Sequence, residues 1–166
     1  YTAVATALTR HEVPPGTDFL LRGSGGMGKA VVAALRDHGL TAGTIIARNE
    51  RTGSALAEQY GFDWAPEPGD RIAPLLVNVT PIGMAGGPQA DDLSFDRRAV
   101  AAAEIVFDVV AFPPRTPLIA AAQELDRRTI TGAEIITAQA AEQFVLYTGI
   151  RPDDELIRRA SEFSRA

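Results

Sequence analysis

The feature that most constrains the fold is a regular alternation of short apolar runs with helix-like stretches. Runs of aliphatic and β-branched residues at Asp18–Arg22, Thr44–Arg48 and Ala73–Thr80 are typical of buried strands. Helical periodicity or a Gly/Pro-rich loop, rather than a hairpin turn, follows each run. Since crossover connections of this kind join parallel strands, the sequence predicts an α/β fold with a doubly wound, mainly parallel sheet and helices on both faces.

The helices of this pattern have recognisable ends. Those predicted at Lys29–His38 and Thr52–Tyr60 are each followed by a glycine, Gly39 and Gly61, of the kind that ends a helix. Further along the chain, the same criteria predict strands at Ile105–Val110 and Thr129–Thr131 and helices at Asp96–Ala103, Leu118–Leu125, Glu134–Tyr147 and Asp153–Phe163.

The composition is that of a globular domain, and it narrows the choice of partner. The chain has 166 residues, of which 46% are hydrophobic and 22% charged, which suits one ordinary domain. Its net charge of -5 argues against a nucleic-acid partner, which normally needs a basic surface. No apolar run is long enough to cross a bilayer, so we expect no membrane partner and a cytoplasmic protein that binds small molecules.

Two further sequence features concern the chemistry and the extent of the chain. Cysteine is absent, which excludes disulfides, a thiolate nucleophile and a cysteine zinc site. The chain begins at Tyr1, within an apolar helical pattern, rather than at Met. We therefore expect it to be a piece of a longer protein.

A glycine-rich loop carries the strongest local signal for binding. Residues 23–28 read GSGGMG, a GxGxxG match between a predicted strand and a predicted helix. Gly23 would permit the tight turn, Gly25 would let the backbone approach a diphosphate, and Gly28 would allow close packing of helix and sheet. Main-chain N–H groups at a helix N-terminus bind anions. The pattern favours a dinucleotide site of the Rossmann type over a glycine turn without a ligand, and the missing GK[ST] excludes a Walker loop.

The residue at the end of the second strand decides between the two common dinucleotides. An acid there would bind the ribose 2′-OH of NAD, whereas an arginine suits the 2′-phosphate of NADP. Arg48 occupies this place and Arg51 adds a second guanidinium group, so NADP is the favoured cofactor. The alternative is a pair of solvated surface arginines for which Glu50 is a local partner.

Side chains that would act as an acid or base at a reacting carbonyl are scarce. Lys29 is the only lysine, and in the first turn after the glycines we expect it to face solvent or phosphate. The two histidines, His11 and His38, lie beside a Pro-Gly breaker and at a helix C-terminus, where structural roles are more common. No HExxH, GxSxG or paired-carboxylate spacing occurs, so we predict no metal ligand and no catalytic residue in this chain.

Five segments, taken together, resemble the cofactor domain of shikimate dehydrogenases. They are GSGGMGKA at 23–30, ARN at 47–49, NVTPIGM at 78–84, DVVAFPPRTPL at 108–118 and TGAEIITAQAAEQFVLYTG at 131–149. Their order and spacing fit over nearly the whole chain, and the NxTPxGM and GxxxxxxQAAxxF patterns are far more specific than the glycine loop. The family reversibly reduces 3-dehydroshikimate to shikimate with NADPH, in two α/β domains with the active site between them.

The resemblance implies a role for each matching position. Val109 and Gly132 would border the nicotinamide with their backbones, and Gln139 would reach the substrate rather than bond only to water. Asn78 and Thr80 lie at a strand end, where ligands of open α/β sheets collect. The positions that would hold the diphosphate are Gly23, Ser24, Gly25, Gly26 and Met27, and those near the adenosine 2′-phosphate are Arg48, Asn49, Arg51 and Thr52.

The family's catalytic lysine and aspartate lie in its other domain, which would precede Tyr1. The resemblance therefore implies that residues 1–166 are an NADP-binding Rossmann domain that is inactive alone and works with a missing N-terminal substrate domain. Its terminal helical segments, 1–12 and 133–166, would connect to that domain or pack toward it.

Several positions depart from the family pattern. Ala47 and Asn49 stand where asparagine and threonine are usual, Ala111 where a tyrosine near the substrate is expected, and Ile135 where methionine is usual. The substrate therefore stays open among shikimate, quinate and other cyclic hydroxy acids.

Two different functions also stay open. One is an NADP-sensing module without a reaction of its own, which the missing base favours, and the second is a methylenetetrahydrofolate dehydrogenase, against which Gln139 in its QAA context argues.

Overall fold

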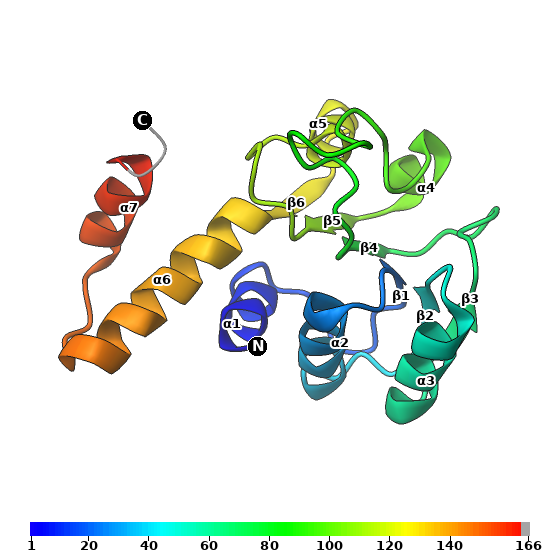
Figure 1. Ribbon diagram of the computed structural model, residues 1–166, viewed down its shortest axis with the longest axis horizontal. Helices are drawn as coiled ribbons and strands as arrows, with labels where there is room; N and C mark the ends of the chain where they lie inside the picture. Colours follow the sequence, from blue (N-terminus) through cyan, green and yellow to red (C-terminus); the bar gives the residue numbers. More distant parts are fainter. Residues whose placement is uncertain (164–166) are drawn as a thin grey trace.

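The computed structural model describes residues 1–163, apart from the side chains at positions 154, 161 and 162. In this part of the chain, six strands form one sheet in the order β3-β2-β1-β4-β5-β6 (Figure 1). Each pair of neighbouring strands is parallel. The strands are β1 (Phe19–Arg22), β2 (Gly43–Ile46), β3 (Asp63–Ala65), β4 (Leu75–Asn78), β5 (Ile105–Asp108) and β6 (Arg128–Thr131).

Helices connect the strands, apart from β3 and β4, which a loop joins, and they cover both faces of the sheet (Figure 1). The helices of one face are α1 (Thr2–Arg10), α2 (Gly26–Asp37) and α3 (Glu50–Tyr60), and those of the other are α4 (Arg97–Ala102) and α5 (Pro117–Glu124). The chain ends in α6 (Gly132–Thr148), which starts beside α1, and α7 (Asp154–Phe163).

The core consists of two hydrophobic clusters, one on each face of the sheet. Phe19 and Leu21 of β1 pack against α1, α2 and α3, whereas Leu20 points to the opposite face and packs against α4 and α5. Because both faces are covered, the strands are apolar almost without interruption. Burying each such large side chain stabilises the fold by about 1.5 to 3 kcal/mol.

Local hydrogen bonds fix the starts of several helices at the carboxyl edge of the sheet. The side chains that accept from a first-turn N–H are Asn49 for α3, Asp96 for α4, Thr116 for α5 and Thr131 for α6. Caps of this kind contribute about 0.5 to 2 kcal/mol each. By contrast, α2 follows Gly25, which has no side chain to cap it.

The observed elements confirm the predicted α/β fold with a parallel sheet. Each predicted strand and helix is present, with ends that differ by a few residues. β3 is not predicted, because its three residues at the edge of the sheet give no periodic signal. Trp64 fixes this strand by donating from Nε1 to the carbonyl of Ala47 at 3.1 Å.

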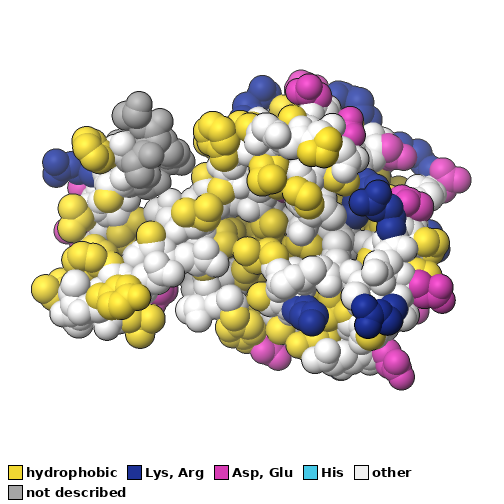
Figure 2. Space-filling view, in the orientation of Figure 1, with side chains coloured by type: hydrophobic (Ala, Val, Ile, Leu, Met, Phe, Trp, Pro, Cys, Tyr) yellow, Lys and Arg dark blue, Asp and Glu magenta, His cyan; other side chains and the backbone are white. Residues whose placement is uncertain are grey.

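The end of α6 and α7 together form an arm that extends from the sheet (Figure 1). Large hydrophobic side chains on this α6–α7 arm are exposed, with Leu146 83%, Tyr147 89% and Phe163 85% accessible. Figure 2 shows hydrophobic side chains gathered over the arm at the left of the view. Among the described residues, no helix combines the length and the apolar character that a membrane span requires.

Candidate functional site

The carboxyl edge of the sheet contains a topological switch point between β1 and β4. The chain leaves β1 toward α2 on one face and leaves β4 toward α4 on the other. In open α/β sheets, ligands bind in the crevice that such diverging connections create. The predicted site residues at positions 23–27, 48, 49, 51, 52, 78 and 80 lie at or just after the ends of β1, β2 and β4, which border this crevice.

Two glycines of the loop after β1 are required by packing within the protein. Gly23 has a φ of +121°, and a Cβ atom there would lie 2.7 Å from Cγ2 of Val79. A Cβ atom at Gly28 would lie 2.9 Å from the carbonyl oxygen of Gly23. These two positions therefore set the tight turn and the close contact between α2 and the sheet.

Gly25 and Gly26, which lie between Gly23 and Gly28, face open space. A Cβ atom at Gly25 or Gly26 would meet no atom of another described segment within 4 Å. The helix that starts here has no side-chain cap and no acidic residue in its first turn. Its first N–H groups and the positive end of its dipole are thus directed at an open crevice, an arrangement that suits a diphosphate.

A hydrogen bond joins the loops after β1 and β2. The hydroxyl oxygens of Ser24 and Thr52 lie 2.8 Å apart, and Asn49 Oδ1 accepts from the backbone N–H of Thr52 at 3.2 Å. Asn49 thus caps α3, while Thr52 connects α3 to the glycine loop. Both residues therefore have hydrogen-bond partners within the protein, in addition to any contact with a ligand.

Arg48 follows β2 and is exposed in the cleft beside the glycine loop. Arg51 is exposed on the first turn of α3 and does not line this cleft. Within residues 1–163, no ion pair joins Glu50 to either arginine. The structure brings Arg48 to the crevice and leaves Arg51 at its margin.

The cleft around these loops has a volume of about 710 Å³. The loops after β1, β2, β3 and β4 contribute to its walls. Its lining residues are Arg22, Gly23, Ser24, Ile46, Ala47, Arg48, Asn49, Pro66, Glu67, Thr80, Pro81, Ile82 and Gln89. The cleft contains cationic and apolar side chains and lies beside exposed backbone donors. This combination suits a phosphorylated nucleoside.

A buried polar network joins the ends of β4 and β5. Asn78, Asp108 and Thr116 are each 0% exposed. Asn78 Nδ2 donates to Asp108 Oδ1 at 2.9 Å, and Thr116 Oγ1 donates to Asp108 Oδ2 at 2.7 Å. Asp108 Oδ1 also accepts from the backbone N–H of Val110 at 3.0 Å. The carboxylate therefore holds together the end of β4, the loop after β5 and the start of α5.

Burial dominates the titration of this carboxylate. It raises the pKa of Asp108 from its ordinary 3.8 to about 6, although the donors from Thr116, Val110 and Asn78 lower it in part. Asp108 and Thr116 are not among the predicted site residues. The signal that could have found them is the register of β4 and β5, which places Asn78 opposite Asp108 and which a single sequence does not reveal.

Asn78 supports the loop after β4 rather than facing the crevice. Its Oδ1 accepts from the backbone N–H of Thr80 at 3.1 Å and from the Thr80 hydroxyl at 2.6 Å, while Nδ2 also donates to the carbonyl of Ile82 at 3.2 Å. Thr80 is partly exposed in the cleft. Of the two predicted residues, Thr80 is thus the one placed to contact a ligand.

Gly132, the first residue of α6, packs against the loop after β5. A Cβ atom there would overlap the carbonyl oxygen of Val109 and the carbonyl group of Val110. The glycine is therefore explained by this close backbone contact. It brings the loop after β5 and the start of α6 to the same edge as the crevice.

Comparisons with known proteins identify the family. No protein-family model matches the chain. The shikimate dehydrogenase-like protein of Haemophilus influenzae is 44% identical over 165 residues, which cover 99% of this chain and 61% of the relative. Further relatives named shikimate dehydrogenase (NADP(+)) are 31% to 37% identical. This chain belongs to the shikimate dehydrogenase family. It spans about three fifths or less of the length of these relatives.

Solved structures of shikimate dehydrogenases have the same fold. A shikimate 5-dehydrogenase-like protein, 43% identical, matches the whole chain and 62% of that structure with a TM-score of 0.97. The shikimate 5-dehydrogenase of Thermus thermophilus, solved in complex with NADP(H) and shikimate, is 29% identical. It matches 97% of this chain and 60% of its own with a TM-score of 0.80.

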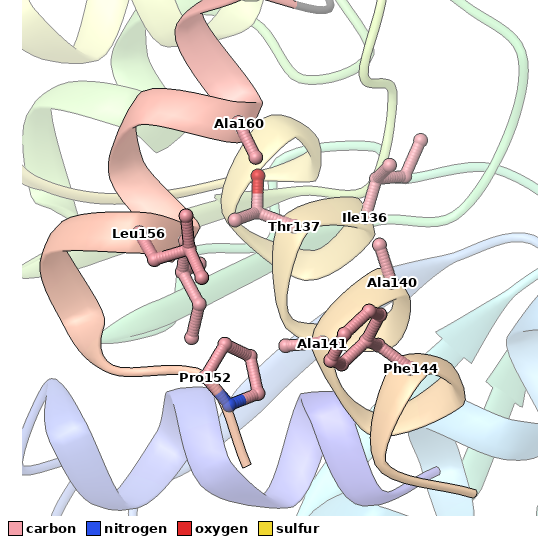
Figure 3. Close-up of a pocket in the computed structure, with 9 residues that line it drawn as sticks. Ile136, Thr137, Ala140, Ala141, Phe144, Pro152, Leu156 and Ala160 are labelled. Atoms are coloured by element: carbon pink, nitrogen blue, oxygen red, sulfur yellow. The ribbon is translucent and has the colours of Figure 1, made fainter. Parts of the chain in front are cut away.

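Gln139, which the family resemblance predicts to reach the substrate, lies in the middle of α6. It is half-buried, and it lies away from the cleft described above. A separate apolar cavity of about 410 Å³ lies between α6 and α7. In Figure 3, Ile136, Ala140 and Phe144 of α6 border it together with Leu156 and Ala160 of α7. This cavity belongs to the arm and contains no charged side chain among its described lining residues.

The two histidines have contacts within the protein, and Lys29 faces solvent. His11 Nε2 lies 2.9 Å from Glu134 Oε2, and His38 Nε2 lies 2.9 Å from the carbonyl of Val13. Lys29 is exposed on α2. Among residues 1–163, no cluster of three or more His, Cys, Asp or Glu side chains is arranged to hold a metal ion.

Proposed function

We propose that this chain is the NADP(H)-binding domain of a shikimate dehydrogenase. The observation that carries the proposal is the uncapped start of α2, whose N–H groups face open space over Gly25 and Gly26. Arg48, at the end of β2, supplies the cation that suits a 2′-phosphate. Two comparisons support the same cofactor. Relatives of this chain are named shikimate dehydrogenase (NADP(+)), and the T. thermophilus neighbour was solved with NADP(H).

The adenosine half of the cofactor is proposed to lie over β1 and β2. The diphosphate would bind the backbone of the glycine loop from Gly23 to Met27, with the dipole of α2 adding to the attraction. The 2′-phosphate would bind Arg48, with support from Asn49, Arg51 and Thr52. Thr80, in the loop after β4, would border the adenosine half of the cofactor.

The nicotinamide half is proposed to lie over β4, β5 and the start of α6. Here the backbones of Val109 and Gly132 would border the ring. Asp108 would act on this half only through the loops it holds, because its carboxylate is fully buried. Asn78 would act in the same indirect way, by fixing Thr80.

NADP(H), when bound, supplies or accepts the hydride in the reversible reduction of 3-dehydroshikimate to shikimate. The contribution of this chain is to bind and orient the cofactor, and Gln139 would hold the substrate. The ionisable side chains that line the cleft are Arg22, Arg48 and Glu67. Our proposal gives none of them a role as an acid or base at a reacting carbonyl. We therefore infer that the acid–base group comes from outside this chain, and that the chain alone binds cofactor without turnover.

The exposed apolar side chains of the α6–α7 arm are consistent with this division of labour. In the proposed enzyme, the arm packs toward a substrate domain that completes the active site. The substrate is proposed to be shikimate or a related cyclic hydroxy acid, since the neighbour with NADP(H) also holds shikimate.

A calorimetric titration of this chain with NADP⁺ and with NAD⁺ tests the proposal. We expect NADP⁺ to bind at least about tenfold more tightly than NAD⁺, and we expect no reduction of NADP⁺ when shikimate or quinate is added. Absence of binding for both dinucleotides would refute the proposed function. Turnover of shikimate by the chain alone would refute the inferred division of labour.

A further inference from the structure

Arg22 is a charged residue at the end of β1, a central strand of the sheet. Its partners on the neighbouring strands are Ile46 and Asn78. Leu20, on the same face of β1, is buried in the core. The Arg22 side chain is 21% exposed, and it lines the cleft that also contains Arg48. Because partial burial of a guanidinium is costly, an arginine at this position needs polar or anionic partners.

Two contacts hold the Arg22 guanidinium in place. Nη1 donates to the carbonyl of Ser94 at 2.5 Å, and Nη2 lies 3.5 Å from Oε2 of Glu67. The Glu67 side chain is 58% exposed, so water screens its charge and it compensates Arg22 only in part. The cation is thus fixed at the cleft with an incomplete counter-charge.

The electrostatic surroundings of Arg22 are unfavourable to a cation without a ligand. Burial lowers the pKa of the Arg22 guanidinium, Glu67 partly opposes this effect, and the like charge of Arg48 lowers the pKa further. Two cations and one partly solvated acid therefore share one cleft. An anion bound there would relieve the repulsion between the two arginines.

We propose that Arg22 is a second residue that selects a dinucleotide phosphorylated on its adenosine ribose, and that Glu67 moderates this selectivity. The inference rests on the proposed function and extends it to two residues that the sequence patterns do not indicate. Arg48 binds the 2′-phosphate, while Arg22 adds positive potential to the same half of the site. The mechanism is electrostatic, so a change of charge at either residue alters NADP binding more than NAD binding.

Substitutions of opposite sign at the two residues test the inference. Arg22→Met keeps most of the side-chain length that packs in the cleft but removes the charge. It should weaken NADP⁺ binding about tenfold and NAD⁺ binding less than about twofold. Glu67→Gln, at a more exposed position, should strengthen NADP⁺ binding a few-fold and leave NAD⁺ binding nearly unchanged.

Two further variants separate charge from packing. Arg22→Lys retains the positive charge and should keep most of the preference for NADP⁺. Arg151→Met is the matched control, because it removes an arginine that is paired with Glu142 on the α6–α7 arm. This variant should change neither affinity. Adenosine 2′,5′-bisphosphate and AMP, titrated in parallel, should reproduce the pattern without a nicotinamide ring.

The outcomes distinguish this inference from the proposed function. If the unaltered chain binds NADP⁺ but Arg22→Met leaves the ratio of the two affinities unchanged, Arg22 has no role in selectivity. An equal loss for both dinucleotides also overturns the inference. If Arg22→Met fails to fold, Glu67→Gln decides, and an unchanged ratio there rejects the electrostatic role. Absence of binding by the unaltered chain removes both proposals.

Discussion

The two halves of the carboxyl edge use their polar groups in opposite ways. Over β1 and β2, the backbone donors of α2 face open space and Arg48 is exposed in the cleft. Over β4 and β5, the polar side chains of Asn78, Asp108 and Thr116 are fully buried and hydrogen-bonded to one another. The first half leaves its polar groups exposed, whereas the second uses them to fix its own backbone.

This difference indicates where a substitution affects binding and where it affects stability. Exposed donors contribute little to the fold, so their loss reduces affinity. Buried polar groups that bond only to one another contribute to the fold, since leaving one unpaired costs about 1 to 3 kcal/mol. Each of the following predictions tests whether the two halves separate in this way.

The largest expected effect is the loss of dinucleotide binding in Gly25→Val. Gly25 has a φ of -75°, which valine adopts, and its Cβ would meet no other segment. The added side chain would occupy the space proposed for the diphosphate. We expect affinity for NADP⁺ to fall at least about a hundredfold, with a change in the free energy of unfolding below about 1 kcal/mol.

Gly132→Ala is the matched substitution on the other half. Its Cβ would overlap the backbone of Val109 and Val110, so the variant should lose about 1 to 3 kcal/mol of stability in a urea titration. If Gly25→Val destabilises the protein as much as Gly132→Ala does, the proposed separation of the halves is wrong.

The second effect is a pH-dependent stability that comes from Asp108. Its folded pKa of about 6 lies above its ordinary 3.8, so the folded state binds the proton more tightly than the unfolded state. The resulting stabilisation is complete below about pH 4 and is lost as the pH rises through about 6. We expect this group to contribute about 2 to 3 kcal/mol more at about pH 4 than at about pH 7.5.

Urea unfolding of the protein and of Asp108→Asn across this pH range measures the effect. The difference in unfolding free energy between the two should increase in favour of the unaltered protein as the pH falls. A difference independent of pH would show that Asp108 titrates normally, and that burial does not dominate its surroundings.

The third effect concerns selectivity on the β1–β2 half. Arg48→Asp replaces the cation at the end of β2 by the acid that suits a free ribose 2′-OH. NADP⁺ binding should weaken by about 2 kcal/mol, whereas NAD⁺ binding should change little. Equal losses in parallel titrations would exclude a role for Arg48 in binding the 2′-phosphate.

The same contrast explains how much the sequence alone could predict. The GxGxxG loop and the β-α alternation depend on local spacing, so the parallel α/β fold and the positions of Gly23, Gly25 and Gly28 were predictable. The strand order that creates the switch point depends on strand pairing and was not predicted. The network around Asp108 depends on which strands pair, and Thr116 follows Asp108 only after a loop. Arg22 lies in a strand that reads as apolar, where no local pattern indicates a charged side chain facing a ligand.

Gly132 illustrates a different limit of sequence reasoning. The family resemblance points to this position because of the cofactor, yet contact with Val109 and Val110 already requires a glycine there. A residue type shared by a family thus does not distinguish a ligand contact from a packing constraint. Only the position of the neighbouring backbone does so.

The smallest expected effect concerns the hydrogen bond that joins the two loops of the β1–β2 half. Thr52→Val keeps the shape of the side chain but removes the hydroxyl that lies 2.8 Å from Ser24 Oγ. We expect a loss of about 1 kcal/mol in stability and a decrease of a few-fold in NADP⁺ affinity, because the glycine loop and Arg48 are no longer held together.

Thr9→Val provides the control for this last substitution. The Thr9 hydroxyl donates to the carbonyl of Ala5 within α1, so its removal is chemically equivalent but remote from the cleft. Stability should change slightly and affinity not at all. If both variants bind NADP⁺ equally well, the bond between Ser24 and Thr52 serves only the fold. The β1–β2 half would then owe its affinity to exposed groups alone, which would make its contrast with the buried network complete.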